Sequence, residues 1–412
     1  MKVLLIAPNC YPVNGAEEIC NIKMLRAMTE NGSFDVDVIS RKRNWFNYPS
    51  DSLESYGVKV NSLTVVESDN RINIKTIWQT IQCFFKFGVT FRGSVWAIVA
   101  LPYVNNLLNQ YKYDFVLTKN SPSFLIGCYL HKKGLKWVAS WNDPSPNIYY
   151  PVPYGKGKET KGTLISRRIV KLMSQADAHV FPASLLRDHM LYYMKVDKSR
   201  TWIAPHVVFP NETKRTDRHE VTNTMRIIHS GNLSSPRDPS TFMLALNEVL
   251  IENPSYRIEF TLLGRLDEAS KTLLNSLDSL NKHCFFHEPI EYKQSLDFIS
   301  NYDLACVIEA DCGKGGGVFL PTKVTDFMQV GIPIMAVSPR SGVLEGLYND
   351  GIIGYYSDVS NVNSIKEAIK KVYNEYTTTG LKHNVIASQF TPQSVVDVYK
   401  QINAALNRNS LT

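Results

Sequence analysis

Residues 309–336, EADCGKGGGVFLPTKVTDFMQVGIPIMA, follow the apolar run LACVI and carry the clearest structural signal in the chain. The apolar run predicts a buried strand, and the glycine-rich loop after it leads to Pro321-Thr322-Lys323, which is typical of a helix start. Gly331 and Pro333 then end the predicted helix before a second apolar run. A strand, a loop, a helix and a strand in this order predict one repeat of a parallel α/β sheet.

The same loop has the features of an anion site. Glycine lets backbone amides approach a ligand closely, a helix start adds a partial positive charge, and Lys323 adds a full one. The ordinary alternative is a structural connection without a ligand, but consecutive glycines are entropically costly and favour a function. The glycines of this loop are Gly313, Gly315, Gly316 and Gly317.

Length and composition indicate two folded domains. The chain has 412 residues, of which 44% are hydrophobic and 20% charged, so it can bury sizeable cores and is not expected to be disordered. Its 7 cysteines include no CxxC pair, which favours neither a disulfide framework nor a zinc site. The N-terminal run MKVLLIAP is too short for a signal peptide and predicts a buried strand, so we expect a cytoplasmic protein.

The charge of the chain is modest overall but locally clustered. A net charge of +7 is weaker than a nucleic-acid binder usually shows, and no nucleic acid partner is expected. Basic residues cluster at 41–43, beside Trp45 and Phe46, and at 156–171. Between the clusters lies the apolar segment 81–103, which is not expected to span a bilayer because Lys86, Arg92 and Pro102 interrupt it. Interleaved aromatic and basic residues suit an anionic membrane surface, and a buried helix pair explains them equally well.

Apolar runs alternate with helix-length segments along the whole chain. This pattern predicts an α/β fold of two parallel sheets covered by helices, which is two Rossmann-like domains facing a cleft. We expect an N-terminal domain at residues 1–207, a polar linker at 208–225 and a C-terminal domain at 226–390. The last predicted helix, within residues 391–412, can pack on either domain, including back on the N-terminal one.

The loops after two predicted strands hold further candidates. The first loop, APNCYPVNGAEE, lacks the GxGxxG spacing of a dinucleotide site, but Gly15 can give a sugar or phosphate access to the helix start. In GNLSSPR, Gly231 follows a predicted strand and Arg237 lies near the next helix, where its planar donors suit a diphosphate. An ion pair with Asp238 explains Arg237 equally well. Gly264 repeats the strand-then-glycine pattern.

Together these residues resemble the retaining glycosyltransferases of the GT-B fold, in particular the large family 4 of sugar-nucleotide-dependent enzymes, over nearly the whole chain. In that family a glycine, an adjacent arginine and a lysine six residues after the glycine open the second domain. This chain has Gly231, Asn232 and Arg237 at those positions. It therefore lacks one positive charge of the family pattern.

The resemblance extends to two other segments. The family's paired glutamates correspond to Val318 and Asp326, and Pro321-Thr322-Lys323 matches a Pro-Ser-Lys element of members that lack the first glutamate. Residues 137–144, WVASWNDP, resemble an aspartate-proline segment of the same subgroup, which implies an acceptor-side role for Asp143. A helix cap or a turn is the ordinary alternative for Asp143.

The resemblance implies a retaining, metal-independent glycosyltransferase of the hexosyltransferase type, without a cofactor, that uses a UDP- or GDP-sugar. Arg237 and Lys323 are then the catalytic cations that stabilise the departing diphosphate. The implied donor-binding residues are Gly15, Gly231, Asn232, Gly264, Gly315, Gly316, Gly317, Thr322 and Asp326. His206, His229 and His287 read as hydrogen-bonded structural residues rather than as bases.

The expected acceptor is a saccharide or a lipid-linked saccharide in surface polysaccharide, exopolysaccharide or lipopolysaccharide biosynthesis, at the inner face of the cell membrane. A second hypothesis is a sugar-nucleotide 2-epimerase of the same architecture, for which no suitable carboxylate cluster is evident in the sequence. A third is a non-catalytic scaffold that binds a nucleotide sugar, which the Asn232 and Val318 departures favour.

Overall fold

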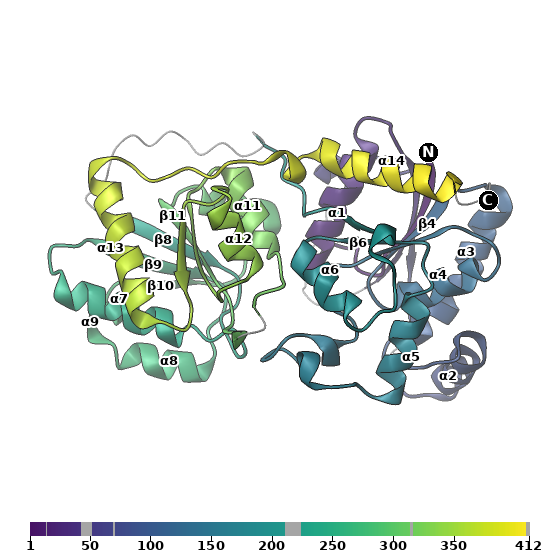
Figure 1. The fold of residues 1–412 in the computed structure, drawn as a ribbon, viewed down its shortest axis with the longest axis horizontal. Helices are drawn as coiled ribbons and strands as arrows, with labels where there is room; N and C mark the ends of the chain where they lie inside the picture. Colours follow the sequence, from purple (N-terminus) through teal and green to yellow (C-terminus); the bar gives the residue numbers. More distant parts are fainter. Residues whose placement is uncertain (14, 43–51, 69–70, 211–223, 314–315, 409–412) are drawn as a thin grey trace. The chain divides into compact units, whose positions relative to one another are not determined.

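The computed structural model describes residues 1–13, 15–42, 52–68, 71–210, 224–313 and 316–408, which form two compact units (Figure 1). The first unit comprises Met1–Tyr150, Gly155–Val207 and Ser388–Thr412, and the second comprises Pro151–Tyr154 and Val208–Ala387. Most of the predicted linker, residues 211–223, lies outside the described part of the chain. The short segment Pro151–Tyr154 belongs to the second unit because Tyr154 bonds to Glu309 and packs its ring on Phe319.

The first unit is built on a 7-stranded parallel sheet of order β3-β2-β1-β4-β5-β6-β7. Its strands are β1 Lys2–Ile6, β2 Asp35–Arg41, β3 Ser62–Val66, β4 Phe115–Lys119, β5 Trp137–Ser140, β6 Ala178–Phe181 and β7 Thr201–Ile203. In the register, Val3 pairs with Val36 on one side and with Phe115 on the other. The strand order reverses between β1 and β4, and ligands of such sheets bind beyond the carboxyl ends of the strands at that point.

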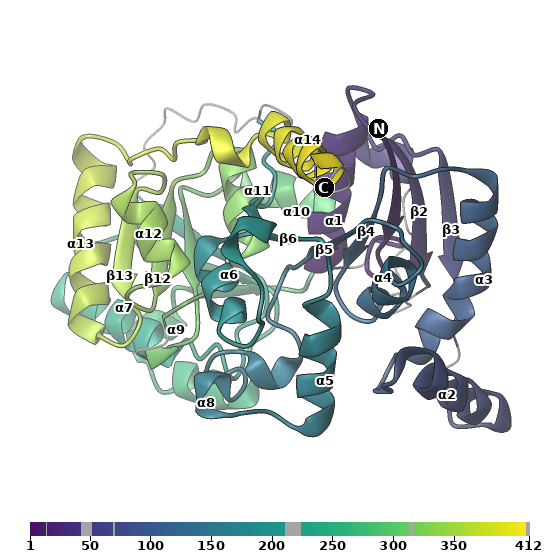
Figure 2. The ribbon, with the colours of Figure 1, turned by 45° about the vertical axis from the view of Figure 1, so that its right-hand side comes forward.

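Helices cover both faces of this sheet (Figures 1 and 2). They are α1 Ala16–Thr29, α2 Ile74–Phe87, α3 Val95–Gln110, α4 Ser123–His131, α5 Leu164–Met173, α6 Ser184–Leu191 and α14 Pro392–Arg408. The C-terminal helix α14 packs beside α1, where Tyr399 contacts the Phe34 ring and its hydroxyl lies 3.3 Å from the Met24 sulfur. The end of the chain thus completes the core of the first unit. Short 3₁₀ helices lie at Leu53–Tyr56, Asn147–Tyr149, Gly157–Glu159, Lys198–Arg200 and Ser388–Phe390.

The second unit has a 6-stranded parallel sheet of order β10-β9-β8-β11-β12-β13. Its strands are β8 Met225–Ser230, β9 Ile258–Leu263, β10 Cys284–His287, β11 Leu304–Ile308, β12 Ile334–Ser338 and β13 Tyr355–Asp358. Its helices are α7 Ser240–Glu252, α8 Glu268–Asn275, α9 Asp278–Asn281, α10 Tyr292–Ile299, α11 Thr322–Val330, α12 Val343–Asn349 and α13 Val362–Thr378. Here the strand order reverses between β8 and β11.

The predicted α/β class with two parallel sheets is confirmed. The strands are continuous apolar runs because both of their faces are covered: every residue of β4, β11 and β12 is buried. The N-terminal run MKVLLIAP forms β1 at the centre of the first sheet. No helix within the described residues has the length and apolar character to cross a membrane.

Candidate functional site

The carboxyl ends of β8 and β11 in the second unit bring charged side chains together. Arg237 lies in the loop between β8 and α7, Glu309 directly follows β11, and Lys323 is in the first turn of α11. A Cβ atom on Gly231, the residue after β8, would lie 3.4 Å from the Lys323 amine. The predicted cations Arg237 and Lys323 therefore lie at the same switch point of the sheet, and the Arg237 charge contributes to lowering the pKa of Lys323.

Arg237 is held by a carboxylate that the sequence reading did not assign to the site. Its guanidinium donates to Glu309 Oε2 at 3.2 Å, and the Tyr154 hydroxyl donates to the same oxygen at 3.3 Å. Burial by itself lowers the pKa of Arg237. The Glu309 charge and Tyr154 together raise it by a larger amount, so the net pKa lies above its ordinary value. The suggested pair with Asp238 is not formed, because Asp238 accepts from the backbone and hydroxyl of Ser240.

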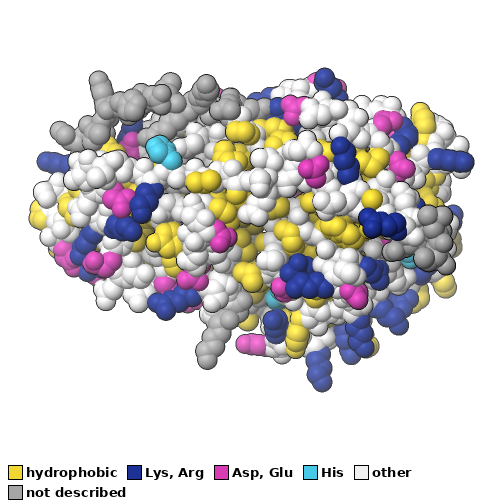
Figure 3. Space-filling view, turned by 45° about the horizontal axis from the view of Figure 1, so that its top comes forward, with side chains coloured by type: hydrophobic (Ala, Val, Ile, Leu, Met, Phe, Trp, Pro, Cys, Tyr) yellow, Lys and Arg dark blue, Asp and Glu magenta, His cyan; other side chains and the backbone are white. Residues whose placement is uncertain are grey.

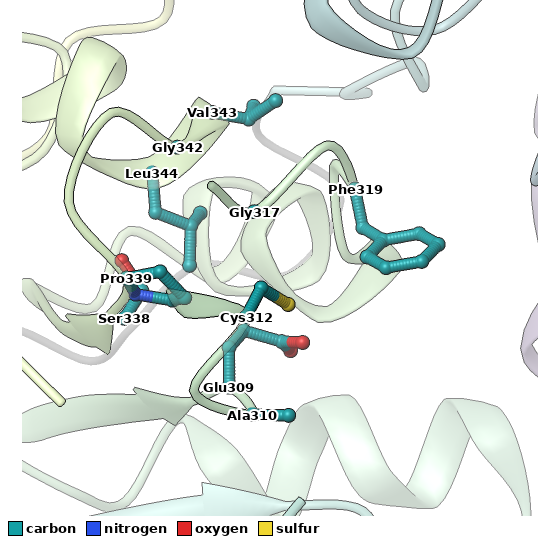
Figure 4. Close-up of a pocket in the computed structure, with 10 residues that line it drawn as sticks. All are labelled: Glu309, Ala310, Cys312, Gly317, Phe319, Ser338, Pro339, Gly342, Val343 and Leu344. Carbon is teal, nitrogen blue, oxygen red and sulfur yellow. The ribbon is translucent and has the colours of Figure 1, made fainter. Parts of the chain in front are cut away.

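Glu309 is 6% exposed, and within the described residues its Oε1 has no hydrogen-bond partner. It lines a cavity of about 250 Å³, including the open mouth, together with Cys312, Gly317, Phe319, Ser338 and Leu344 (Figure 4). The Ser338 hydroxyl is also buried there without a partner from the described part of the chain. Buried polar atoms are normally paired, so two open ones in one cavity indicate a place for a polar ligand or for water.

Lys323 is positioned by His229. The Lys323 amine lies 3.2 Å from His229 Nε2, and His229 Nδ1 lies 3.0 Å from the carbonyl oxygen of Cys306 on the neighbouring strand. A carbonyl can only accept, so Nδ1 carries the proton and Nε2 accepts from Lys323. Burial, followed by the charges of Lys323 and Arg237, lowers the pKa of His229 well below its ordinary value, which keeps the ring neutral.

The electrostatics of Lys323 make its charge sensitive to pH. Burial is the largest cause, and the nearby Arg237 charge the second, of a decrease in the pKa of Lys323 to about 7. An anion bound beside the amine favours its charged form and raises this pKa again. With a pKa of about 7, the Lys323 amine is partly uncharged at neutral pH until an anion binds beside it.

The glycines of the second unit let loops approach one another. A Cβ on Gly264 would lie 2.4 Å from the carbonyl oxygen of Gly231, and both residues have positive φ. Gly316 has a φ of +63°, and a Cβ there would lie 2.7 Å from the carbonyl oxygen of Ser341. Gly317 accepts a backbone hydrogen bond from Val343. These contacts provide a packing reason for the glycines; Gly315 lies outside the described residues.

Hydrogen bonds within the second unit hold three further predicted donor-binding residues, Asn232, Thr322 and Asp326. Asn232 Oδ1 accepts from the backbone of Arg265 at 3.0 Å and so joins the loops after β8 and β9. The Thr322 carbonyl accepts from the Thr325 hydroxyl, and Asp326 Oδ1 accepts from the Tyr292 hydroxyl at 2.8 Å. These bonds account for the local conformation, and any donor contact of the three residues stays a prediction.

In the first unit, Gly15 directly precedes α1 with an extended backbone. Asp143 is exposed and hydrogen-bonded to Tyr150, whose pKa rises through burial and then through the Asp143 charge. The contact does not decide between the two interpretations, and the acceptor-side role of Asp143 stays a prediction.

A second cavity, which sequence reasoning missed, lies at the carboxyl ends of β4 to β7 in the first unit. It measures about 320 Å³ with its open mouth and is lined by Lys119, Ser140, Asn142, His206 and Tyr399, among others. Lys119 is 5% exposed, and burial lowers its pKa. Asn142 Oδ1 is buried without a partner from the described residues. The sequence signals for this cavity were His206 and the segment 137–144, which were considered separately, and the position of Lys119 at the end of an apolar run.

Comparisons with known proteins identify the fold. No protein-family model and no curated protein sequence matches this chain. The structure is similar to the lipopolysaccharide outer core galactosyltransferase WaaB in its apo form, with 11% identity, a TM-score of 0.60, and coverage of 98% of this chain and 99% of that one. A structure described as trehalose-6-phosphate from E. coli bound with UDP-2-fluoro glucose has 11% identity, a TM-score of 0.59, and coverage of 99% and 98%.

A third similar structure has a different activity. The UDP-GlcNAc 2-epimerase from Neisseria meningitidis, bound to UDP-GlcNAc, has 13% identity, a TM-score of 0.55, and coverage of 98% and 99%. At these identities the likeness shows the fold, which is the GT-B architecture of two Rossmann-like domains. Because transferases and epimerases share this fold, the function has to be argued from the site.

Proposed function

We propose that this protein is a glycosyltransferase that moves a sugar from a nucleotide-sugar donor to a saccharide or lipid-linked saccharide acceptor. The observation that carries the proposal is the pair of cations at the β8–β11 switch point, Arg237 held by Glu309 and Lys323 held by His229. The similar structures support it because their descriptions name a galactosyltransferase and a UDP-sugar complex. The proposed process is surface polysaccharide, exopolysaccharide or lipopolysaccharide synthesis at the inner face of the cell membrane.

In this proposal Arg237 and Lys323 bind the diphosphate of the donor. Glu309 uses one oxygen to orient the Arg237 guanidinium, whose Nε has no hydrogen-bond partner among the described residues. A guanidinium fixed in this way can still offer donors to a phosphate. Lys323 gains its proton as the diphosphate approaches, since the anion raises the pKa of the amine from about 7.

Charge on the leaving group is then stabilised where it develops. As the bond between the sugar and the diphosphate breaks, negative charge grows on the leaving oxygen, and preorganised cations stabilise that charge more than the ground state. The acceptor hydroxyl forms the new bond on the same face, and its proton passes to the departing phosphate oxygen. This retaining route requires neither a protein base nor a metal ion.

The unpaired Oε1 of Glu309 and the Ser338 hydroxyl can form hydrogen bonds with a hydroxyl of the donor's sugar or ribose. Glu309 lines the cavity, and its Oε1 is an acceptor without a partner among the described residues, so a hydroxyl can donate to it while accepting from another group. The proposed donor is a UDP- or GDP-sugar. The cavity of the first unit, with Lys119 and Asn142, is the proposed acceptor side, in addition to Asp143.

The first experiment is a thermal-shift screen with nucleoside diphosphates and their sugars, because a ligand that binds only the folded state raises its melting temperature. A UDP- or GDP-type ligand is expected to stabilise the wild type, and Arg237→Ala is expected to lose the shift. Arg265→Ala is the matched control, since Arg265 is exposed in the adjacent loop and pairs with Glu288. No shift with any nucleotide would contradict the proposal.

A sugar-nucleotide 2-epimerase is the second candidate, and one observation favours it. Glu309 is a buried carboxylate that faces a cavity, which the sequence reading had not placed in the site. Epimerisation requires groups that remove and return a proton, and such a carboxylate can do this. Incubation with donor alone, followed by NMR, separates the two: a new epimer without acceptor indicates the epimerase, and transfer only with acceptor indicates the transferase.

A further inference from the structure

Helix α2, Ile74–Phe87, turns its most apolar face to solvent. The exposed side chains on this helix include Ile74, Ile77, Trp78, Ile81, Phe84 and Phe85. Trp78 is 59% exposed and Phe85 is 82% exposed. The buried side of the same helix is formed by the smaller set Thr76, Cys83 and Phe87. An amphipathic helix in a globular protein normally places its apolar stripe against the core, so this helix has the reverse orientation.

The spacing shows that the exposed stripe is one continuous face. Positions 74, 77, 78, 81 and 85 follow the i, i+3, i+4, i+7, i+11 pattern of a single helix side. Both ends of the helix are capped. Asn73 and Thr76 form a capping box at the start, and Gly88 ends the helix with a φ of +72°. The outward stripe therefore belongs to a well-capped helix and does not come from a frayed end.

Basic residues of α2 itself border the stripe. From Arg71 to Tyr113 the sequence contains no Asp or Glu. Lys75 and Lys86 are both exposed and lie eleven positions apart, which places them on the same side of α2 beside the apolar face. An apolar stripe with lysines along its edge is the pattern of helices that lie in a membrane interface.

Helix α5 extends this surface. Its Arg168 guanidinium lies beside the C-terminal end of α2, because a Cβ on Gly88 would be 2.8 Å from an Arg168 nitrogen. Figures 1 and 2 both show α5 next to α2. The first turn of α5 exposes Leu164 and Ile165, and Arg167, Arg168 and Lys171 are exposed on the same helix. Figure 3 shows several Lys and Arg side chains close together at its lower right.

We propose that the exposed faces of α2 and α5, named here the α2–α5 surface, dock on an anionic lipid bilayer with α2 lying in the plane of the interface. The aromatic and aliphatic stripe enters the boundary of the acyl chains, and the flanking lysines and arginines contact the negative headgroups. For residues 81–103 the sequence left a membrane contact and a buried helix pair equally open. In the structure Trp96, Ala97, Ala100, Leu101 and Val104 of α3 are buried, so the proposed contact lies on α2 and α5 instead.

The positive charge of the α2–α5 surface favours an anionic bilayer over a second copy of the chain as its binding partner. A symmetric dimer through α2 would bring two basic borders together, and like charges across an interface are unfavourable. The proposal concerns the first unit only and is independent of sugar transfer, because vesicle binding needs neither donor nor acceptor.

The test is co-sedimentation of the full chain with vesicles of phosphatidylcholine, with and without phosphatidylglycerol. The wild type is expected to sediment with the anionic vesicles, and added salt is expected to weaken this binding. The variant Ile77→Ser/Trp78→Ser/Phe85→Ser is expected to stay in the supernatant. Lys75→Glu/Lys86→Glu is expected to bind about 25-fold or more weakly, from about fivefold for each basic residue.

The matched control is Ile251→Ser/Phe285→Ser/Phe286→Ser, which removes exposed apolar side chains from the second unit. This control is expected to bind vesicles as the wild type does. Circular dichroism spectra and melting temperatures close to those of the wild type show that each variant is folded. Vesicle binding is expected to shift tryptophan emission to the blue. Because the chain has 6 tryptophans, the variant Trp78→Phe is needed to assign the shift to Trp78: the shift is expected to be absent in this variant.

Three results would overturn the proposal. The first is a wild-type chain that remains in the supernatant with anionic vesicles. The second is an equal loss of binding in the control and in the α2 variant. The third is a wild type that dimerises without vesicles and becomes monomeric on substitution of the α2 stripe, which would assign the surface to a second copy.

Discussion

The carboxyl ends of the two sheets carry different chemistry. In the second unit, Arg237 and Lys323 lie at the β8–β11 switch point, and Glu309 and His229 hold them. In the first unit the corresponding cavity beside β4 contains Lys119, whose pKa is lowered by burial. It also contains the amide oxygen of Asn142, which has no hydrogen-bond partner among the described residues. A diphosphate requires several fixed charges, whereas a sugar hydroxyl requires a few hydrogen-bonding groups. This difference is the basis of the proposal that the donor binds to the second unit and the acceptor to the first.

The largest expected effect comes from removing Arg237. Arg237→Ala is expected to lower turnover roughly 100-fold or more, because a preorganised donor to the leaving group is lost. The substitution also leaves the buried Glu309 charge without its ion pair and lowers the melting temperature.

A double variant separates these two effects of Arg237. Arg237→Ala/Glu309→Gln is expected to recover the melting temperature but not the turnover, while Arg265→Ala stays near wild type in both. Turnover is measured with donor and acceptor, and melting is measured by calorimetry. Turnover restored by the double variant would mean that Arg237 serves only the fold.

The second prediction concerns pH. The pKa of Lys323 is about 7 in the empty site, and the bound diphosphate raises it. Below pH 7 the amine is already charged, so donor affinity is expected to be flat there. Above pH 7 binding must be accompanied by proton uptake, and donor affinity is expected to fall by up to about tenfold per pH unit.

Titration calorimetry in buffers of different ionisation enthalpy checks this proton uptake directly. Lys323→Met is expected to bind the donor weakly with a flat pH profile, and the exposed Lys271→Met is the control. A wild-type affinity that stays constant between about pH 6 and about pH 9 would exclude Lys323 as the titrating group.

A smaller effect is expected at Lys119 in the first unit. Lys119→Met is expected to raise the acceptor KM about tenfold, because the acceptor loses one hydrogen bond to a charged group. The nucleotide-induced thermal shift is expected to stay unchanged. The fold is expected to tolerate it, because a buried cation is replaced by an apolar side chain of similar length. The exposed Lys112→Met serves as the control, and an unchanged acceptor KM in Lys119→Met would remove this cavity from the acceptor side.

The smallest predicted effect compares two buried hydroxyls. Ser338 and Ser357 lie on neighbouring strands, and both hydroxyls lack partners among the described residues, but only Ser338 lines the Glu309 cavity. Replacing either by alanine is expected to stabilise the empty protein by about 1 kcal/mol, since an unpaired buried polar group is removed. Only Ser338→Ala is expected to weaken donor binding, by a few-fold at most. Equal donor affinity in both variants would show that Ser338 does not contact the donor.

The sequence predicted much of the fold but only part of the candidate site. Gly231, Arg237 and Lys323 were found because a glycine after a strand and a cation near a helix start are local signals. Glu309 and His229 were missed as site residues, because their importance comes from partners far away in the chain: Glu309 bonds to a residue 72 positions distant and His229 to one 94 distant. Such pairs depend on β8 lying next to β11.

Helix α2 illustrates the same limit on a surface. The apolar residues of α2 recur with a helical period, yet the period does not say which face packs on the neighbouring helices. The structure places Thr76, Cys83 and Phe87 inward and the larger apolar side chains outward. Only packing on α3 and α4 decides that orientation.

The sequence by itself determined the alternation of buried strands and helices, the two-sheet α/β class and the positions of the main cations, since periodicity and turn chemistry are local properties. The tertiary structure alone decided which carboxylate holds Arg237, that a neutral histidine holds Lys323, how far burial lowers the pKa of that lysine, and which face of α2 meets solvent. These features depend on strand order and burial, which arise from contacts between residues far apart in the chain.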